Sequence, residues 1–216
     1  MNPPVRNHHR NADRRILRER LEASGVSDRV TSAVLEVPRD QFVPEQMSRY
    51  AWHDGSLPIG AGQTISQPSL VGRMIDLLRT EPEHKILDVG TGSGYQAAIL
   101  SLLVSHVVTV ERIPSLCESA MHRLESLGYK NVSVHLVGEE LGWPESAPYD
   151  GIIVGAASPV VPTALVNQLR IGGRLIVPVG TRDEQRVISV LRTPDGSEEI
   201  DLEPVRFVPL IGEGAW

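Results

Sequence analysis

Short apolar segments alternate with helical segments from Lys85 onward, and this alternation restricts the fold more than any other feature. Apolar runs rich in β-branched residues predict strands at Lys85–Val89, His106–Glu111, Val132–Leu136, Gly151–Val154 and Arg174–Val177. The helices predicted between them are Tyr95–Leu103, Pro114–Leu127 and Pro162–Arg170. Strands and helices that alternate in this way form a mostly parallel sheet that is covered on both faces.

The two ends of the chain break the alternation. At the C-terminal end, Gln185–Leu191 and Glu199–Val208 predict an antiparallel pair of strands around a turn at Thr193–Gly196. At the N-terminal end, the polar residues 1–12 are expected to form a mobile tail, and helices are predicted within residues 13–80. The expected organisation is one domain, residues 13–216, whose α/β core covers residues 81–216.

A long segment without regular spacing lies inside the N-terminal part. Two amphipathic helices are predicted between Asp13 and Pro38, and another from Pro68 to about Arg79. Residues 39–67 between them contain several prolines and glycines but no sustained period, which predicts a long ordered loop. A loop of this length inside a compact domain usually carries function.

Composition and charge exclude several classes of protein. Lys and Arg number 21 against 27 Asp and Glu, a formal charge of −6, which argues against a protein that neutralises nucleic-acid phosphates. No apolar run is long enough to cross a membrane, and the first residues lack the apolar segment of a secretory signal. The single cysteine, Cys117, fits a reducing compartment. We therefore expect a soluble, cytoplasmic protein without a metal, a nucleic-acid partner or a membrane partner.

A glycine-rich segment between a strand and a helix marks a ligand site. Asp88 precedes Gly90-Thr91-Gly92-Ser93-Gly94, at the strand end where open α/β sheets bind ligands. The dinucleotide fingerprint is not matched, because Tyr95 stands where the third glycine would be. Glu111 ends the next strand, where a carboxylate can accept hydrogen bonds from ribose hydroxyls. If Asp88 and Glu111 face one crevice, they repel a pyrophosphate and attract a sulfonium, which favours S-adenosylmethionine over NAD.

These motifs resemble those of a known enzyme family. DVGTGSG followed by VTVE is similar to the first two motifs of the Rossmann-like class I methyltransferases. The loop YAWHDGSLPIGAGQTISQP, residues 50–68, resembles the signature loop of the protein-L-isoaspartate (D-aspartate) O-methyltransferases. Further matches are VPRDQFVP at 37–44, YD at 149–150, IIVGAA at 152–157 and VRFVPL at 205–210. The resemblance covers nearly the whole chain from about residue 15.

The resemblance implies a fold, a reaction and partners. The implied fold is a class I methyltransferase with a mostly parallel seven-stranded sheet, an antiparallel closing strand, helices on both faces and an N-terminal helical extension. The implied reaction transfers a methyl group from S-adenosyl-L-methionine to the free α-carboxylate of L-isoaspartyl, and more weakly D-aspartyl, residues in damaged proteins, leaving S-adenosyl-L-homocysteine. The ester then closes to a succinimide, which starts repair. We expect isoaspartyl-containing peptides and proteins as substrates, and a monomer or weak dimer.

The resemblance also assigns site residues, with Ser66 as the catalytic residue. The implied cofactor contacts are Thr64, Ile65, Ser66, Asp88, Gly90, Thr91, Gly92, Gly94, Glu111, Arg112, Gly138, Glu139 and Glu140. The implied substrate contacts are Ile59, Gln63, Ser66 and Val208. Where the family usually has Gly-Asp-Gly, this chain has Gly138-Glu139-Glu140, so Glu139 is expected to receive the adenine amino group.

The chemistry makes its own demand on the loop. A carboxylate is ionised at pH 7 and needs no general base, but its in-line attack on a sulfonium methyl needs alignment and exclusion of water. This predicts a loop rich in neutral donors, such as Gln63, Thr64 and Ser66. Ser66 is expected to donate to the substrate carboxylate; the alternative is that it only caps the helix that begins at Pro68.

Other interpretations stay open at this point. The chain could be a related O-methyltransferase that esterifies aspartate on a dedicated peptide precursor, a binding module without catalysis, or a dehydrogenase. Trp52 and Trp143 could stack on the adenine or the peptide, or serve only in packing.

Overall fold

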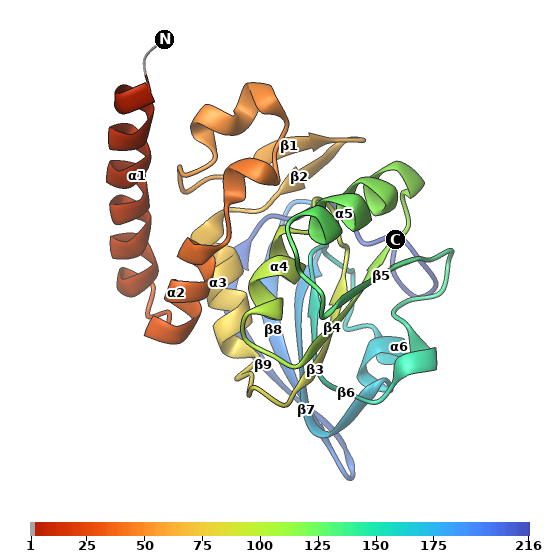
Figure 1. Ribbon diagram of the computed structural model, residues 1–216. Coiled ribbons are helices and arrows are strands. Elements are labelled where there is room, and N and C mark those ends of the chain that lie inside the picture. Colours follow the sequence, from red (N-terminus) through yellow and green to blue (C-terminus); the bar gives the residue numbers. More distant parts are fainter. Residues whose placement is uncertain (1–2) are drawn as a thin grey trace.

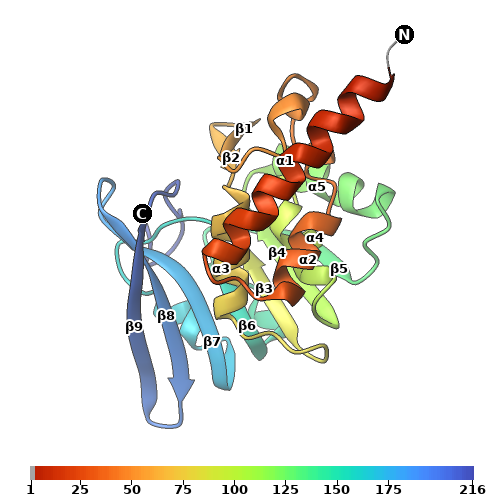
Figure 2. The same ribbon diagram turned by 90° about the vertical axis from the view of Figure 1, so that its left-hand side faces the viewer.

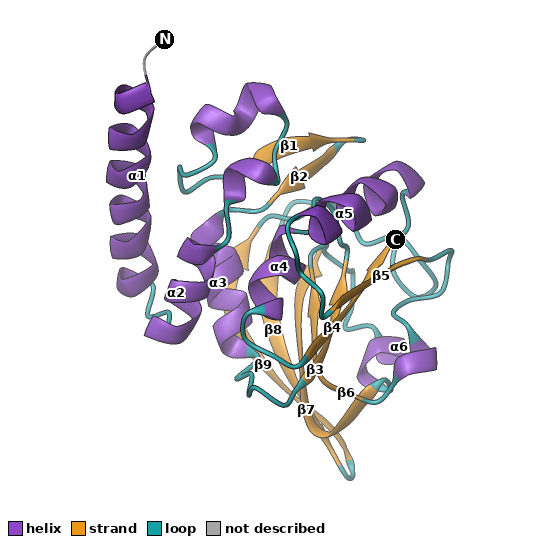
Figure 3. Cartoon of the chain, in the orientation of Figure 1, coloured by secondary structure: helices purple, strands orange, loops and turns teal. Residues whose placement is uncertain are grey.

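The computed structural model describes residues 3–216, with side chains from residue 12 onward. Its centre is a seven-stranded sheet in the order β5-β4-β3-β6-β7-β8-β9 (Figure 1, Figure 3). The strands are β3 Lys85–Val89, β4 His106–Glu111, β5 Val132–Leu136, β6 Tyr149–Val154, β7 Leu169–Gly180, β8 Gln185–Thr193 and β9 Gly196–Val205. Pairing is parallel from β5 to β7, whereas β8 runs antiparallel to both of its neighbours. The expected mostly parallel seven-stranded sheet is confirmed.

Alternation of side chains along the central strands produces two apolar layers. Ile86 and Ile153 face the first layer, whereas Leu87 and Ile152 face the second. All four are fully buried, as expected for parallel strands that are covered on both faces. Leu87 of β3 pairs with Ile152 of β6, so the register places side chains of the same layer next to each other on neighbouring strands.

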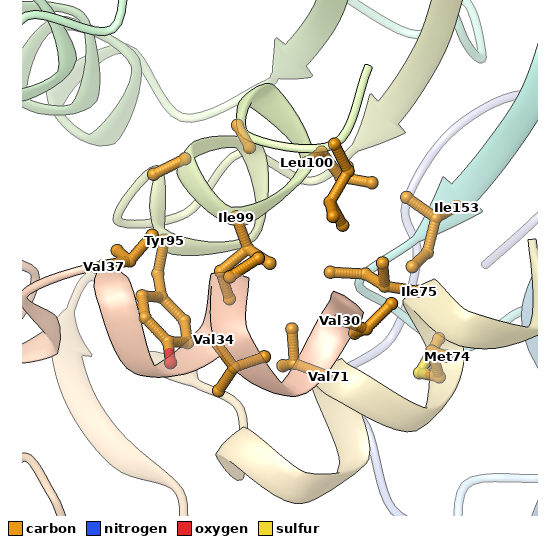
Figure 4. Close-up of a cluster of buried hydrophobic side chains, with 14 of the residues drawn as sticks. Val30, Val34, Val37, Val71, Met74, Ile75, Tyr95, Ile99, Leu100 and Ile153 are labelled. Atoms are coloured by element: carbon orange, nitrogen blue, oxygen red, sulfur yellow. The ribbon is translucent and has the colours of Figure 1, made fainter. Parts of the chain in front are cut away.

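Helices cover both faces of the sheet. They are α1 Pro3–Ala23, α2 Asp28–Glu36, α3 Pro68–Leu77, α4 Tyr95–Ser101, α5 Pro114–Ser126 and α6 Thr163–Val166. Side chains of α2, α3 and α4 meet in the first layer, where Ile75 lies beside Ile153 of β6, and Val34 and Ile99 belong to the same cluster (Figure 4). The second layer is covered by α6, through Leu165, and by loops.

The helical N-terminal extension packs against this first layer. Helix α1 lies across α2 and α3, and its Leu17 and Leu21 are fully buried (Figure 2). Gly72 of α3 permits the close approach, because a Cβ at that position would lie 2.7 Å from Leu21 Cδ2. The helix begins at Pro3, ten residues before its expected start, so most of the expected tail is helical. The mobility of that segment remains a prediction.

Two expected elements differ from the structure. Residues 39–67 contain short 3-10 helices at Arg39–Gln41 and Glu45–Tyr50, then a hairpin of β1 Leu57–Gly60 and β2 Gln63–Ile65. The predicted helix Pro162–Arg170 is reduced to α6, because Leu169 already pairs with Tyr149 as the first residue of β7. Within residues 3–216, no helix combines the length and apolar character needed to cross a bilayer.

Candidate active site

The glycine-rich segment forms a tight turn between β3 and α4. Gly90, Gly92 and Gly94 have φ angles of 95°, 54° and 88°, a left-handed region that other residues rarely adopt. A Cβ at Gly94 would also lie 3.1 Å from Leu124 Cδ1 of α5, so this glycine lets the two helices pack closely. The turn therefore leaves its backbone open at the carboxyl edge of the sheet.

Glu111 fixes this turn to the end of β4. Its Oε2 accepts a hydrogen bond from the backbone N–H of Gly92 at 2.9 Å. Its Oε1 accepts from the N–H groups of Arg112 and Ile113, at 2.9 and 3.0 Å. The side chain is buried in this network, which places one negative charge at the strand end where a ligand is expected.

Asp88 lies beneath the turn. Alternation along β3 directs its side chain toward α4, where Oδ1 accepts from Gln96 Nε2 at 2.7 Å and Oδ2 from Thr109 Oγ1 at 2.8 Å. Burial raises the pKa of Asp88 to about 7, although the bonds from Gln96 and Thr109 oppose this shift. Of the two carboxylates expected to face the crevice, Glu111 therefore does so, whereas Asp88 does not.

A cleft of about 120 Å³ opens beside Glu111 and the glycine turn. The expected cofactor residues that line it are Thr64, Gly90, Gly92, Glu111, Arg112, Gly138 and Glu140. Those that do not line it are Ile65, Ser66, Asp88, Thr91, Gly94 and Glu139. The sequence interpretation missed the apolar residues that line one side of this cleft, Ile113, Val137, Leu141 and Leu210. Their apolar character was the only signal in the sequence, and it does not distinguish them from residues of the core.

A second, larger cleft of about 460 Å³ lies between the signature loop and the C-terminal end of β9. Of the expected substrate residues, Ser66 and Val208 line it, whereas Gln63 lines the smaller cleft. Ile59 of β1 lines neither; its Cδ1 would lie 3.3 Å from a Cβ placed on Gly92, so it packs over the glycine turn.

Charged residues that the sequence interpretation did not single out also line the larger cleft. Arg73 Nε of α3 lies 3.5 Å from Glu203 Oε1 of β9, and Arg206 follows on the same side. These residues come from segments about 130 positions apart, so no local pattern could have grouped them.

The two clefts meet at Thr64 and Gly155, which line both. Gly155 follows β6, and a Cβ there would lie 3.3 Å from the carbonyl oxygen of Gly90. A glycine at this position therefore keeps the junction open and lets the loops after β3 and β6 approach each other. Groups bound in the two clefts would therefore be nearest to each other at this junction.

Ser66 lies in the larger cleft next to the junction. It is half-buried, and among the described residues its hydroxyl makes no hydrogen bond. It does not cap α3, because Asp54 Oδ1 accepts from the N–H of Ser69 at 2.9 Å and supplies that cap. The capping alternative is therefore wrong, and the Ser66 hydroxyl is available to a ligand.

The remaining candidates have packing contacts. Trp143 stacks on His135 with ring centroids 4.3 Å apart, and Trp52 is buried under the guanidinium of Arg14. Neither tryptophan lines either of the two clefts described above. Cys117 is buried in α5. Within the described part of the chain, no group of three or more His, Cys, Asp or Glu side chains is placed to hold a metal ion.

Curated relatives resemble the chain over most of its length. The family model described as protein-L-isoaspartate (D-aspartate) O-methyltransferase matches residues 12–215. The protein-L-isoaspartate O-methyltransferase of Pelotomaculum thermopropionicum is 48% identical over 205 residues, which are 94% of this chain and 90% of that protein. A Geotalea uraniireducens enzyme, protein-L-isoaspartate O-methyltransferase 1, is 49% identical over 212 residues, 95% of this chain and 96% of the relative.

Solved structures agree with this assignment. A protein-L-isoaspartate O-methyltransferase superposes with a TM-score of 0.84 at 30% identity, over 94% of this chain and 67% of the other. A Plasmodium falciparum structure assigned to the same enzymes, in complex with S-adenosyl-L-homocysteine, gives 0.75 at 25% identity, over 89% of this chain and 95% of that one. The resemblance inferred from the motifs is confirmed. The chain belongs to the protein-L-isoaspartate (D-aspartate) O-methyltransferase family, and it is a class I methyltransferase that uses S-adenosyl-L-methionine.

Proposed function

We propose that this chain transfers a methyl group from S-adenosyl-L-methionine to the free α-carboxylate of L-isoaspartyl residues, and more weakly of D-aspartyl residues. The resulting ester closes to a succinimide, which starts the repair of damaged proteins. The observation that carries the proposal is the junction of the two clefts at Thr64 and Gly155, with the unpaired hydroxyl of Ser66 beside it. Membership of the family over nearly the whole chain supports the same reaction.

The residues of the smaller cleft fit the cofactor. Gly90 and Gly92 have no Cβ, so a ligand can approach their backbone closely. The Glu111 carboxylate can accept hydrogen bonds that the ribose hydroxyls donate. The apolar wall at Ile113 and Leu141 suits an adenine ring. We propose that Asp88 contributes indirectly, by supporting the turn from below. When bound, the cofactor supplies an electrophilic methyl group on a sulfonium.

The larger cleft aligns the nucleophile. The substrate carboxylate is ionised at pH 7, so no side chain has to remove a proton. Ser66 donates a hydrogen bond to one carboxylate oxygen and directs the other toward the junction. The β1–β2 hairpin covers the glycine turn through Ile59 and limits the access of water. Water would slow the reaction, because it stabilises the separated charges of the carboxylate and the sulfonium before they react. Alignment and exclusion of water are the two contributions the protein makes.

The direct test compares two peptides that differ only in one linkage. Purified protein with methyl-labelled S-adenosylmethionine is expected to label an isoaspartyl peptide and to leave the matched aspartyl peptide unlabelled. Equal labelling of both peptides, or labelling of the aspartyl peptide alone, would favour the alternative, a related O-methyltransferase that esterifies aspartate on a dedicated peptide precursor. No labelling of either peptide, despite cofactor binding in calorimetry, would contradict the proposed reaction.

Ser66→Ala is expected to lower turnover of the isoaspartyl peptide roughly 10- to 100-fold, because a hydrogen bond to a charged group contributes about 1.5–3 kcal/mol. Cofactor affinity should stay within about threefold, since Ser66 lies outside the smaller cleft. Steady-state kinetics and calorimetry give the two values. Ser126→Ala is the control, because that hydroxyl bonds only Arg123 O at the end of α5. Unchanged turnover in Ser66→Ala would remove Ser66 from the site.

We further propose that the chain acts in the cytoplasm as a monomer or weak dimer. The buried single cysteine, Cys117, is consistent with a reducing compartment. Sedimentation velocity at micromolar concentration tests the oligomeric part of this proposal.

A further inference from the structure

Arg39 is a fully buried arginine for which the reaction described above has no role. It opens the short 3-10 helix Arg39–Gln41 and is among the largest side chains with no solvent exposure. Its guanidinium carbon lies 5.6 Å from the centre of the Tyr95 ring. Burial lowers the pKa of Arg39, and removing a charged group from water is costly unless other groups compensate.

The compensation comes from backbone carbonyls of one segment. Nη1 donates to Ala51 O at 2.5 Å and to His53 O at 3.3 Å. Nη2 donates to Gly55 O at 2.9 Å and to Ser66 O at 3.0 Å. A single guanidinium therefore joins the beginning of segment 51–66, which contains the β1–β2 hairpin, to its end at Ser66.

The residues just after Ser66 are fixed by a separate set of contacts. Asp54 Oδ2 accepts from Gln67 Nε2 at 2.9 Å, and Asp54 Oδ1 caps Ser69 N at 2.9 Å. Asp54 belongs to the segment that Arg39 holds, between the bonded carbonyls of His53 and Gly55. The backbone of Ser66 is thus held by Arg39 on one side and by Asp54 on the other, while its hydroxyl stays free.

We propose that Arg39 is a positioning residue for methyl transfer, which acts by fixing the Ser66 backbone and hence the direction of its hydroxyl. This inference rests on the proposed role of Ser66. The planar fork of arginine can reach carbonyls on both sides at once, whereas the single ammonium of lysine cannot. A displacement of about 1 Å in a group that aligns reactants can cost on the order of 10²-fold in rate.

The first test is Arg39→Lys. The kcat for an isoaspartyl peptide is expected to fall roughly 10- to 100-fold, with cofactor affinity by calorimetry within about threefold of wild type. Arg29→Lys is the control, because the Arg29 guanidinium also bonds backbone carbonyls, those of Thr80 and Leu103, but these lie outside both clefts. Its kcat should stay within about twofold. A normal kcat in Arg39→Lys would overturn the inference.

The second test separates positioning from general stability by a double-mutant cycle. If Arg39 acts through Ser66, Arg39→Lys should cost less than about threefold in kcat when Ser66 is already alanine. Independent, multiplying effects would overturn the inference while leaving the role of Ser66 intact. An inactive wild type or a fully active Ser66→Ala would instead contradict the proposed function, and the inference with it.

A third variant covers the case in which a buried lysine is not tolerated. Arg39→Gln keeps a neutral donor in the same place and enters the same cycle. If Arg39→Lys and Arg39→Gln both lose cofactor binding and far-ultraviolet circular dichroism, Arg39 supports the whole fold and the positioning inference is overturned.

Discussion

Replacement of Glu111 by glutamine is expected to weaken S-adenosylmethionine binding by roughly 10- to 100-fold or more, since a hydrogen bond to a charged group contributes about 1.5–3 kcal/mol. The substitution removes the charge beside the cofactor cleft. It also places an amide NH₂ against backbone N–H groups, because both oxygens of Glu111 accept from Gly92, Arg112 and Ile113. The attachment of the glycine turn to β4 through this side chain is therefore weakened, while the backbone bonds from Gly90 and Thr91 to Val110 O remain.

Titration calorimetry with S-adenosylmethionine and S-adenosylhomocysteine measures this loss. The control is Glu118→Gln, which removes an equal charge from the exposed side of α5. Its affinity should equal that of wild type. If Glu111→Gln binds both compounds normally, the cofactor lies outside the smaller cleft and the proposed site is misplaced.

Asp88→Asn is expected to remove a pH dependence of stability that wild type has. The folded-state pKa is about 7 and the ordinary value is 3.8, so the folded protein binds this proton more tightly than the unfolded chain. The stability contributed by protonated Asp88 is fully present below pH 3.8 and is lost as the pH rises through 7. Between pH 5 and pH 8 the loss is roughly 2–3 kcal/mol, at 1.36 kcal/mol per pKa unit.

Urea denaturation of both proteins at several pH values tests this expectation. The difference in free energy of unfolding, wild type minus Asp88→Asn, should fall by that amount between pH 5 and pH 8. Asparagine can still accept from Gln96 and pair with Thr109, so the variant should fold. Asp195→Asn, on the exposed β8–β9 turn, is the control. Parallel pH curves for wild type and Asp88→Asn would show that Asp88 is ionised when buried.

The sequence predicts the central strands well because their signal is local. The strands His106–Glu111 and Val132–Leu136 have the same bounds in the prediction and in the structure, because each β-branched run ends at a glycine or a polar turn. The hairpin of β1 and β2 was not predicted, because strands of three and four residues are too short to show a period. The C-terminal part of the predicted helix at Pro162–Arg170 became strand, because pairing with β6 outweighs local helix preference.

The parts of the site that are formed by consecutive residues could be predicted from the sequence. The parts that depend on the direction of side chains in the folded protein could not. Glycines and an acid at consecutive strand ends pointed to the smaller cleft, where we propose that the cofactor binds. That Asp88 points toward α4 follows from the register of β3, which the sequence does not state. The side chain of Arg39 bonds backbone carbonyls. Every residue has a backbone carbonyl, so the sequence does not indicate which of them an arginine will bond.

The edge strand of the sheet, β9, affects how the enzyme interacts with unfolded substrate proteins. Within the part of the chain that the structure describes, strand β9 pairs only with β8, and its exposed residues include Glu198, Glu199 and Asp201. Glu199 and Asp201 share one face of the strand, where Asp201 pairs with Arg186, and Glu198 lies on the other. Damaged polypeptides are often partly unfolded and offer unpaired strands of their own, which a bare edge would capture. Charged side chains on both faces of an edge strand discourage such pairing. The charges on β9 therefore oppose pairing of this edge with an unfolded substrate chain.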